Sequence, residues 1–310
     1  MRAALLHAFG GPLTVEEAPE PVATDGQVVV ELRYAAVNPL DVWTCNGNFA
    51  AITKLPHIPG VEAIGHAREK AFLVRGGGIG IASAGTYAQR IAVASGSLVE
   101  VPAGVDLQQA ASMGVAGLTA WRCVHDLGRV AAGDTVLVTG ATGGVGSLAV
   151  QLAAATGATV IGQTSNRAKS KAIVQLGATA VIASDGAGLA AALAGAQPSV
   201  IVDGLGGTFV RAGIEALANE GRFVSYGTSS DTEASIDMRV LYRKGASLLG
   251  YTGLRESDPS AAYAEIFAAV AAGQLRMAID DVLPLEDASE AHARILERRV
   301  TGKLLLDVNR

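Results

Sequence analysis

The stretch Asp134-Thr-Val-Leu-Val-Thr139 is followed by Gly140-Ala-Thr-Gly-Gly-Val-Gly146, then by Ser147-Leu-Ala-Val-Gln-Leu-Ala-Ala-Ala-Thr156, Gly157 and Ala158-Thr-Val-Ile-Gly-Gln163. The apolar run Val136–Val138, bounded by turn residues, predicts a parallel strand that is buried on both faces. The leucines and alanines after Gly146 predict a helix that packs flat on a sheet, and Gly157 is typical of a helix C-terminus. With a second strand at Thr159–Gln163, the stretch predicts a βαβ unit.

The glycines between the first strand and the helix have the spacing of a nucleotide-binding turn. Such glycines let the backbone turn tightly and approach a diphosphate, which the free N–H groups of a helix N-terminus attract. At the pattern G-x-G-x-x-G the chain has Ala141, Gly143 and Gly146, so the first glycine is replaced. Between a strand and a helix the turn predicts a dinucleotide site rather than a merely structural βαβ turn. We expect the diphosphate to rest on Thr142, Gly143, Gly144 and Val145.

The end of the second strand indicates which nicotinamide cofactor is used. A site for NADH places Asp or Glu there to bind the ribose hydroxyls. This chain has no carboxylate at that point; it has hydroxyl, amide and cationic side chains, which suit a 2′-phosphate. We therefore expect NADPH, with the 2′-phosphate bound by Ser165, Asn166, Arg167 and Lys169. The alternative is that Arg167, Lys169 and Lys171 are only the polar face of the next helix.

Composition limits the class of protein. The 310 residues are enough for two domains, and half of them are hydrophobic. The net charge is 24 − 29 = −5, which argues against a nucleic-acid partner bound through a basic surface. The two cysteines, Cys45 and Cys123, have no metal-ligand spacing and favour a reducing, cytoplasmic setting. We expect no membrane-spanning segment and no secretory leader.

The order of elements along the chain predicts an α/β protein with two domains. Residues 1–115 are predicted to be rich in strands, with Gln27–Val37 the longest of them. Within 116–252, strands alternate with helices, which is typical of a doubly wound parallel sheet. We expect its last strand at Ala246–Tyr251. The segment 253–310 is predicted to return to the first domain, so that residues 1–115 and 253–310 form one discontinuous domain.

Several motifs together resemble one known family. In chain order they are Ala36-Val-Asn-Pro-Leu-Asp41, Pro59-Gly60, Gly117-Leu-Thr-Ala120, Gly140–Gly146 and Thr301-Gly-Lys303. Over nearly its whole length the chain resembles the zinc-independent quinone oxidoreductases of the medium-chain dehydrogenase/reductase superfamily. The resemblance implies a GroES-like β-rich catalytic domain and a Rossmann domain that binds NADPH. It also implies a homodimer, formed through the last Rossmann strand at about Ser247–Thr252.

The zinc-binding branch of that superfamily has ligands that this chain lacks. Where that branch has a cysteine the chain has Asn38, and where it has a histidine the chain has Val61. The third ligand, a cysteine, would fall near 113–116, where there is none, and the structural-zinc loop is missing. His57, Glu62 and His66 are close in sequence, but we expect a turn histidine and ordinary polar contacts there. The sequence therefore predicts no metal.

The resemblance also suggests which residues form the reaction site. The Asn38 amide and the Thr119 hydroxyl are the candidate catalytic hydrogen-bond donors; because the matching residues lie beside the nicotinamide, they are candidates for cofactor binding too. Asp41 is expected to have a structural or cofactor-side role. Trp43 and Phe49 are candidates for an apolar substrate wall, with plain core packing as the alternative. Later strands end at further cofactor candidates, with ordinary turns as the alternative: Gly204, Leu205, Gly227 and Thr228.

The family often has tyrosine at the Trp43 position and another aromatic residue at the Phe49 position; neither side chain here has a phenolic hydroxyl. Without a metal, hydride transfer suits a quinone or an α,β-unsaturated carbonyl, whose conjugated system spreads the incoming charge. We therefore expect an NADPH-dependent reductase of such small molecules. The alternatives are a biosynthetic enoyl reductase for a bulky or tethered intermediate, a non-catalytic NADPH-binding protein, and a chain with non-redox chemistry.

Overall fold

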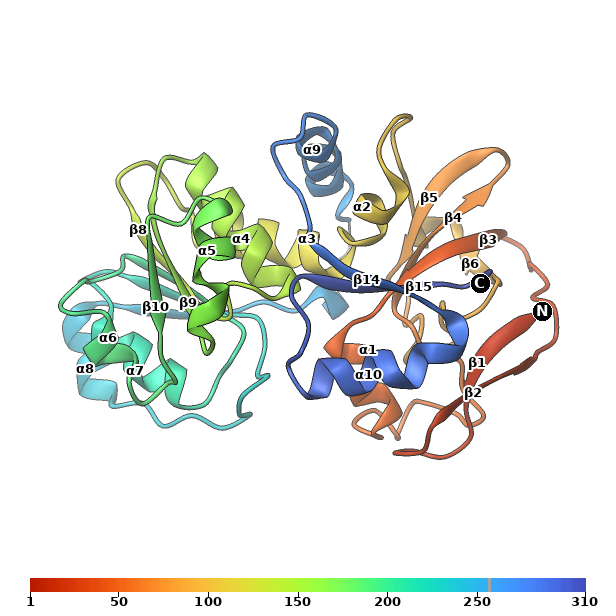
Figure 1. The fold of residues 1–310 in the computed structure, drawn as a ribbon, viewed down its shortest axis with the longest axis horizontal. Coiled ribbons are helices and arrows are strands. Elements are labelled where there is room, and N and C mark those ends of the chain that lie inside the picture. The colour runs from red at the N-terminus through yellow and green to blue at the C-terminus, as the bar shows by residue number, and fades with distance from the viewer. Residues whose placement is uncertain (256–257) are drawn as a thin grey trace. The chain divides into compact units, whose positions relative to one another are not determined.

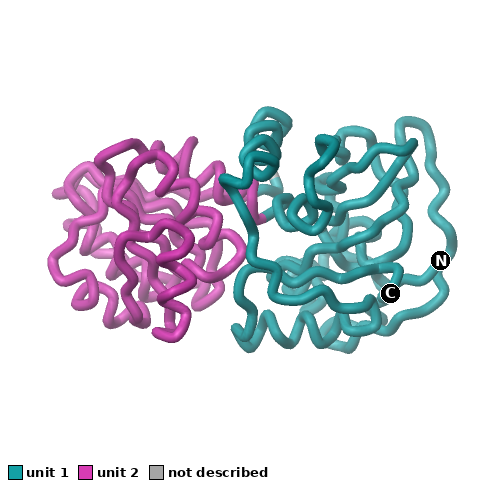
Figure 2. Tube along the Cα trace, turned by 45° about the horizontal axis from the view of Figure 1, so that its top comes forward, with its two compact units in different colours: residues 1–115, 253–310 teal, residues 116–252 magenta. Residues whose placement is uncertain are grey.

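A computed structural model of the chain describes residues 1–255 and 258–310. These residues form two compact units, which are coloured separately in Figure 2. Unit 1 consists of Met1–Val115 with Gly253–Arg310, and unit 2 of Ala116–Thr252. Unit 2 is therefore a single continuous segment inserted between the two parts of unit 1.

Unit 2 is built on a six-stranded sheet in which every neighbouring pair of strands is parallel. The strands are β8 (Thr135–Val138), β9 (Thr159–Thr164), β10 (Ala180–Ala183), β11 (Val200–Asp203), β12 (Arg222–Ser225) and β13 (Ser247–Gly250). Their order across the sheet is β10-β9-β8-β11-β12-β13. Counted from β8, this is the order 3-2-1-4-5-6 of a Rossmann domain, which confirms the doubly wound parallel sheet.

Helices cover both faces of this sheet. They are α3 (Val115–Trp121), α4 (Gly144–Ala155), α5 (Ser170–Gln175), α6 (Leu189–Ala192), α7 (Thr208–Ala216) and α8 (Met238–Lys244), with the short helices η2 (Arg122–Leu127) and η3 (Arg167–Lys169). In Figure 1, α4 and α5 lie on one face of the sheet, and α6, α7 and α8 lie on the other. The central strands β8 and β11 are almost wholly buried, as their apolar runs predict; Val136, Leu137 and Val138 are fully buried.

Unit 1 contains a second, mixed sheet. Its strands are β3 (Gln27–Ala36), β4 (Glu62–Ala67), β5 (Lys70–Arg75), β6 (Arg90–Ala94), β7 (Leu98–Glu100), β14 (Ile279–Pro284) and β15 (Lys303–Asp307). The order is β14-β15-β3-β4-β5-β7, and β6 also pairs with β3. Only β14 and β15 pair in parallel; the other pairs are antiparallel. This mixed sheet confirms the β-rich, GroES-like domain that the resemblance implied.

The C-terminal strand is an internal member of that sheet. Strand β15 lies between β14 and β3, with Leu305 opposite Ala36. All five residues of β15 are buried. The tail of the chain therefore completes the sheet that the first hundred residues begin.

The remaining elements of unit 1 surround this sheet. They are the antiparallel pair β1 (Arg2–Leu6) and β2 (Leu13–Glu17), helices α1 (Pro39–Cys45), α2 (Leu107–Ala111), α9 (Ser260–Ala271) and α10 (Ala288–Leu296), and the short helices η1 (Ser95–Ser97), η4 (Gly253–Arg255) and η5 (Leu285–Asp287). Helices α1 and α10 lie side by side (Figure 1). Buried side chains from β3, β15 and α10 join in one apolar core, which includes Leu32, Leu306 and Ala291.

Residues 107–127 form separate helices rather than one continuous helix. Helix α2 ends at Ala111, α3 begins at Val115, and η2 continues α3 as a π-helix. The break coincides with Gly114, where a Cβ atom would overlap the Glu62 carboxylate and lie 3.1 Å from its Cδ. The carboxylate that occupies the space beside Gly114 thus comes from 52 positions earlier in the chain.

Candidate active site

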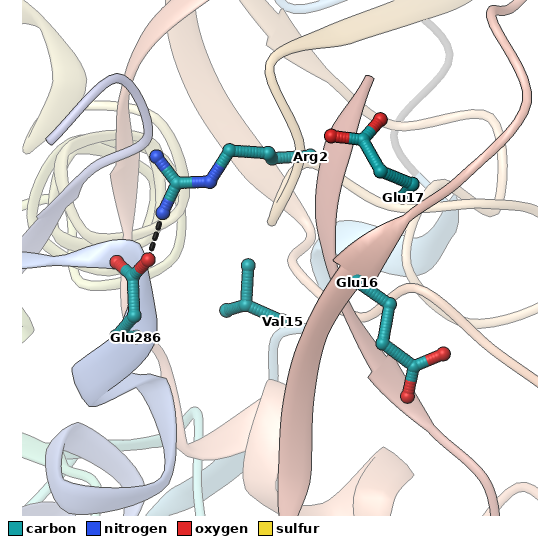
Figure 3. A pocket seen from close by; sticks show the side chains of 5 residues that line it. All are labelled: Arg2, Val15, Glu16, Glu17 and Glu286. Carbon is teal, nitrogen blue, oxygen red and sulfur yellow. Dashed lines mark hydrogen bonds and ion pairs between the residues drawn. The ribbon is translucent and has the colours of Figure 1, made fainter.

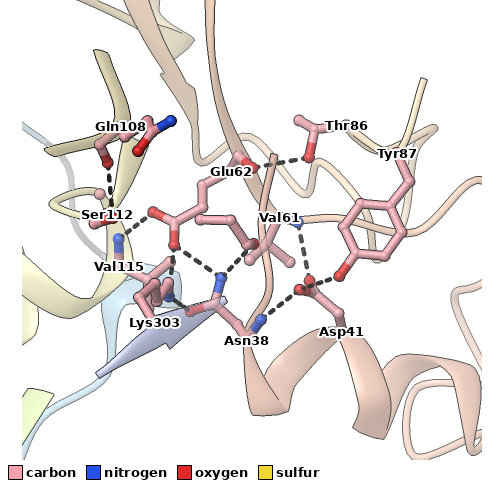
Figure 4. Close-up of polar contacts among 12 residues, drawn as sticks. Asn38, Asp41, Val61, Glu62, Thr86, Tyr87, Gln108, Ser112, Val115 and Lys303 are labelled. Atoms are coloured by element: carbon pink, nitrogen blue, oxygen red, sulfur yellow. Dashed lines mark hydrogen bonds and ion pairs between the residues drawn. The ribbon is translucent and has the colours of Figure 1, made fainter. Parts of the chain in front are cut away.

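The polar centre of unit 1 lies at one end of its sheet, where three strands begin or end. Asn38 follows the end of β3, Glu62 begins β4, and Lys303 begins β15. The pairing of Leu305 with Ala36 brings Lys303 opposite Asn38, and the pairing of Ala63 with Ala35 brings Glu62 to the same edge. Figure 4 shows the three side chains pointing toward one another.

These side chains form a buried, hydrogen-bonded ion pair. Lys303 Nζ lies 3.0 Å from Glu62 Oε1 and donates to Asn38 Oδ1 at 2.5 Å. Lys303 is 4% exposed and Glu62 is fully buried. Charges so far from water persist only when they are paired and hydrogen-bonded, and this pair meets both conditions.

The Asn38 amide has no uncommitted donor. Its Nδ2 donates to Glu62 Oε1 at 2.8 Å and to the backbone oxygen of Ala36 at 3.1 Å. An amide nitrogen has only two hydrogens, so both are used. The expectation that Asn38 donates to a bound ligand therefore needs correction: in this arrangement only the second lone pair of Oδ1 remains, and that is an acceptor.

Asp41, on helix α1, is fully buried and does not join this ion pair through its side chain. Its Oδ2 accepts from the backbone N–H of Asn38 at 2.8 Å and from the Tyr87 hydroxyl at 3.0 Å, and its Oδ1 accepts from the N–H of Val61 at 3.0 Å. Burial raises the pKa of Asp41 to about 7, although these hydrogen bonds and the charge of Lys303 act in the opposite direction. Asp41 thus ties α1 to the neighbouring strand, which is a structural role.

A histidine extends the Asp41 cluster. The Tyr87 hydroxyl lies 3.2 Å from His292 Nε2, on helix α10. Burial lowers the pKa of His292 to about 4, so the ring is neutral at neutral pH. Sequence reasoning missed both residues, because neither belongs to a local motif and they lie 205 positions apart.

The second oxygen of Glu62 reaches the start of α3. Glu62 Oε2 accepts from the backbone N–H of Val115 at 2.5 Å. The free N–H groups of a helix N-terminus favour a carboxylate in this position. Helix α3 also contains Thr119, in unit 2, which is 7% exposed. Within residues 1–255 and 258–310 no hydrogen bond from the Thr119 hydroxyl is found, so this hydroxyl keeps its donor.

Trp43 and Phe49, the candidate apolar wall, lie in and just after α1. Both residues are half-buried. Nearby, Ile52 is 54% exposed and Leu55 is 37% exposed. The backbone oxygen of Phe49 accepts from the N–H of Ile52 at 2.9 Å, which keeps these two residues close. The segment therefore combines two half-buried aromatic side chains with two exposed aliphatic ones.

In unit 2 the predicted diphosphate turn lies between β8 and α4. Gly140 has φ +58°, in the left-handed region that favours glycine. A Cβ atom on Gly146 would overlap the Gly140 carbonyl oxygen and lie 2.9 Å from its carbon, so helix and turn approach closely. At Gly143 a Cβ atom would meet nothing nearer than 3.4 Å. Close packing therefore requires glycine at position 146, whereas the packing of the turn does not require it at position 143.

Gln163 supports this turn, and sequence reasoning missed it. Its Oε1 accepts from the N–H of Gly140 at 2.9 Å, and its Nε2 donates to the backbone oxygen of Ser184 at 2.6 Å. A side chain at the end of β9 thus fixes the turn after β8 and the segment after β10. Ser184 Oγ is buried and has no hydrogen-bond partner among the described residues. A buried hydroxyl without a partner can form a hydrogen bond to a bound polar ligand.

Side chains at the ends of β9, β11 and β12 surround the same edge of the sheet. After β9, Ser165, Asn166 and Arg167 are exposed and Lys169 is half-buried; Asn166 Oδ1 accepts from the N–H of Ala168 at 2.9 Å. Gly204 and Leu205 directly follow β11, and Gly227 and Thr228 follow β12 with one residue between. In open α/β sheets ligands bind at the carboxyl ends of the strands, so these residues fit a nicotinamide dinucleotide.

Asp203, the last residue of β11, is a further buried carboxyl at this edge. It accepts from the Thr139 hydroxyl at 2.6 Å and from the N–H of Gly206 at 2.9 Å. Burial raises the pKa of Asp203, while these hydrogen bonds act in the opposite direction. Its contacts join the ends of β8 and β11 and indicate a structural role.

Unit 1 also contains a pocket at its first strands. Arg2, Val15, Glu16, Glu17 and Glu286 line it, and Arg2 pairs with Glu286 (Figure 3). Three carboxylates around one guanidinium make its wall acidic, which disfavours an anionic cofactor.

The described residues contain no group of three or more His, Cys, Asp or Glu side chains that could hold a metal ion. In particular, His57 Nε2 lies 3.0 Å from the backbone oxygen of Gly80, Glu62 pairs with Lys303, and His66 is exposed. No described helix combines the length and the apolar character needed to cross a membrane.

Comparisons with known proteins identify the family. Residues 24–71 match the alcohol dehydrogenase GroES-like domain, and residues 176–306 match the zinc-binding dehydrogenase model. The chain is 31% identical to the mouse (Mus musculus) quinone oxidoreductase-like protein 2, in a match that covers 99% of this chain and 92% of the mouse protein. The chain belongs to the quinone oxidoreductase family of the medium-chain dehydrogenase/reductase superfamily.

Solved structures agree with this family. The quinone oxidoreductase from Thermus thermophilus, determined with its NADPH complex, has a TM-score of 0.85 at 28% identity and matches 99% of this chain and 100% of its own. A structure described as an NAD-dependent alcohol dehydrogenase has a TM-score of 0.90 at 29% identity, with coverages of 99% and 100%. The family's fold and relatives support an NAD(P)-dependent oxidoreductase acting on a small molecule.

Proposed function

We propose that this chain is an NADPH-dependent reductase that transfers hydride to a quinone or an α,β-unsaturated carbonyl without zinc. The observation that carries the proposal is the buried contact of Lys303 with Asn38 and Glu62. The ammonium group of Lys303 thus lies against Asn38, at a position where the zinc branch has a cysteine ligand. The mouse and Thermus thermophilus quinone oxidoreductases support the substrate class.

The residues that would hold NADPH belong to unit 2. The turn 142–145 would bind the diphosphate, and Ser165, Asn166, Arg167 and Lys169 would bind the 2′-phosphate through hydroxyl, amide and cationic groups. Gly204, Leu205, Gly227 and Thr228 would line the cofactor side of the later strands. Bound NADPH supplies the hydride. The absence of a carboxylate at positions 164–169 supports NADPH over NADH.

Thr119 is the donor that we assign to the reaction. A correctly placed hydroxyl that donates to the developing oxyanion contributes about 3 kcal/mol, or about 100-fold in rate. Asn38, with both N–H groups used, would instead accept from a ligand donor such as the nicotinamide carboxamide. Trp43 and Phe49 would form one wall for a flat, conjugated substrate. The matched pair Thr119→Val and Thr119→Ser tests the assignment, because only the second keeps the hydroxyl.

The first experiment is NADPH consumption by the purified protein in the presence of a chelator. The substrates are an ortho-quinone, a para-quinone, an enone and a 2-enoyl thioester, with NADH run in parallel. Turnover of quinones with NADPH, unaffected by the chelator, is the expected result. Turnover of the thioester alone would move the assignment to an enoyl reductase, and binding of NADPH without any turnover would refute catalysis on these substrates.

We also propose a homodimer formed through β13, in a reducing compartment such as the cytoplasm. Strand β13 is the outer strand of the six-stranded sheet, and Leu248 within it is 43% exposed. An exposed outer strand can pair with its copy about a two-fold axis. Both cysteines are free and buried, which agrees with a reducing setting. Light scattering on the native chain and on Leu248→Lys tests the dimer, because only the native chain should have twice the monomer mass.

A further inference from the structure

The ion pair of Lys303 and Glu62 determines which way the Asn38 amide points. In the observed orientation, Oδ1 faces the ammonium at 2.5 Å and Nδ2 faces the carboxylate at 2.8 Å. Rotating the amide by a half-turn would bring its N–H₂ against Lys303, a donor against a donor, and its oxygen against Glu62, an acceptor against an anion. The buried ion pair therefore selects one of the two orientations, related by a half-turn, that an asparagine amide can otherwise adopt.

The same carboxylate also fixes the start of helix α3. Glu62 Oε2 accepts from the N–H of Val115, and Gly114 leaves the space that this oxygen occupies. The backbone oxygen of Gly114 in turn accepts from the Tyr263 hydroxyl at 2.9 Å. One hydrogen bond therefore holds the first residue of the helix and another holds the residue before it. Thr119 follows four residues after Val115 on the same helix.

We propose that Glu62 and Lys303 are positioning residues that set the Asn38 amide as an acceptor toward the cofactor and anchor the helix that carries Thr119. The inference rests on the proposed function for the roles of Asn38 and Thr119. The contacts themselves, and the orientation they impose, can be tested without any turnover. Neither residue touches the reacting atoms in this assignment; both act through their partners.

The test compares Lys303→Met, Glu62→Gln and the double variant. Each single change leaves one buried charge without its partner, so each should lower thermal stability. The double variant removes both charges and should recover much of that stability. It cannot restore the amide orientation, because the new glutamine can rotate together with Asn38. We therefore expect kcat of the double variant to remain about tenfold to 100-fold below wild type, while NADPH affinity, measured by fluorescence, stays within about twofold because the cofactor phosphates are bound in unit 2.

The matched control is the exposed pair of Lys70 and Glu100, whose charged groups are 2.9 Å apart. Lys70→Met with Glu100→Gln makes the same chemical change on the surface and should leave kcat and stability near wild type. If the double variant at Lys303 and Glu62 recovers wild-type kcat together with its stability, the pair is only structural and the proposal is overturned.

A second readout separates this proposal from the proposed function. The chain has six asparagines, so selective ¹⁵N-asparagine labelling gives few side-chain amide signals, and Asn38→Ser identifies one of them by its loss. Wild type should show a single pair of Asn38 NH₂ signals protected from hydrogen exchange, and the double variant should lose that protection or show two such pairs. An unchanged signal refutes the positioning role, whether or not the wild type turns over any substrate in the panel.

Discussion

Alanine substitutions at Gly143 and Gly146 should separate the two reasons for glycine in the turn after β8. Gly146→Ala places a methyl group against the Gly140 carbonyl and 3.1 Å from the Ala141 Cα atom. These are backbone atoms, so they cannot move aside as a flexible side chain would. Gly143 has φ −79° and ψ 174°, which alanine adopts freely, and its Cβ atom would have ordinary contacts.

The magnitude follows from the overlap. Inserting a methyl group where backbone must shift costs about 1–3 kcal/mol. Unit 2 has 137 residues, from Ala116 to Thr252. For a domain of that size each kcal/mol lowers Tm by roughly 4 °C, so Gly146→Ala should lower the Tm of unit 2 by about 4–12 °C. Gly143→Ala should leave Tm within about 2 °C, since its added methyl group meets no strain.

Cofactor affinity should be lowered by the substitution at Gly143, which leaves the stability of the domain unchanged. If the diphosphate approaches the backbone at 142–145, a methyl group on Gly143 occupies part of that space, and we expect NADPH to bind about tenfold or more weakly. Differential scanning calorimetry without cofactor gives the stability, and fluorescence titration with NADPH gives the affinity. Unchanged affinity in Gly143→Ala would refute the diphosphate assignment, and unchanged Tm in Gly146→Ala would refute the close approach of turn and helix.

Three further outcomes are expected. The double variant Arg167→Ala, Lys169→Ala should bind NADPH about tenfold or more weakly and bind NADH nearly as the wild type does. An equal loss of affinity for both cofactors would contradict the 2′-phosphate assignment, as would the same loss of NADPH affinity in the surface control Lys54→Ala. Burial raises the pKa of Asp41 from 3.8 to about 7, so the contribution of Asp41 to stability is lost as pH rises from 3.8 to about 7. Burial lowers the pKa of His292 from 6.5 to about 4, so the contribution of His292 to stability is lost as pH falls from 6.5 to about 4. The two trends oppose each other. As pH falls from 6.5 to 4, His292→Gln should gain stability relative to wild type by up to about 3 kcal/mol. Parallel curves of Tm against pH for the two proteins would exclude a lowered pKa of His292. Burial, and secondarily the charge of Asp41, raises the pKa of Cys45 to about 12, and burial also raises the pKa of Cys123. A thiol reagent at about pH 8 should therefore label neither cysteine in the folded protein and both after unfolding. Rapid labelling of the native chain would count against the burial of the two cysteines.

The βαβ stretch could be predicted well because its signals are local. An apolar run, a glycine turn and a helical pattern follow one another within about thirty residues, and β8, α4 and β9 form there with boundaries shifted by at most three positions. Strands β4 and β5 gave no such signal. The turn between them contains Arg68 and Glu69 with φ of 49° and 66°, a conformation usually marked by glycine or asparagine.

The reaction site could be predicted only in part. Asn38 and Thr119 followed from motifs, but the state of the Asn38 amide depends on Lys303, which is 265 positions away. Lys303 was visible as part of the closing motif Thr301-Gly-Lys303, yet nothing local showed that its ammonium faces a carboxylate. Whether a side chain is a donor or an acceptor depends on its partners, and those partners come from strand pairing between the two ends of the chain.

The placement of β15 between β14 and β3 has a consequence for synthesis of the protein on the ribosome. Unit 2 is continuous and can complete its sheet as soon as residue 252 has emerged. Unit 1 cannot: the edge of β3 that pairs with β15 stays open until residues 303–307 appear, 188 residues after Val115. At roughly 5–20 residues per second, this interval lasts about 10–40 s. During that time the buried charge of Glu62 has no ammonium partner, so the last strand delivers both the missing backbone pairing and the counter-ion of the candidate active site.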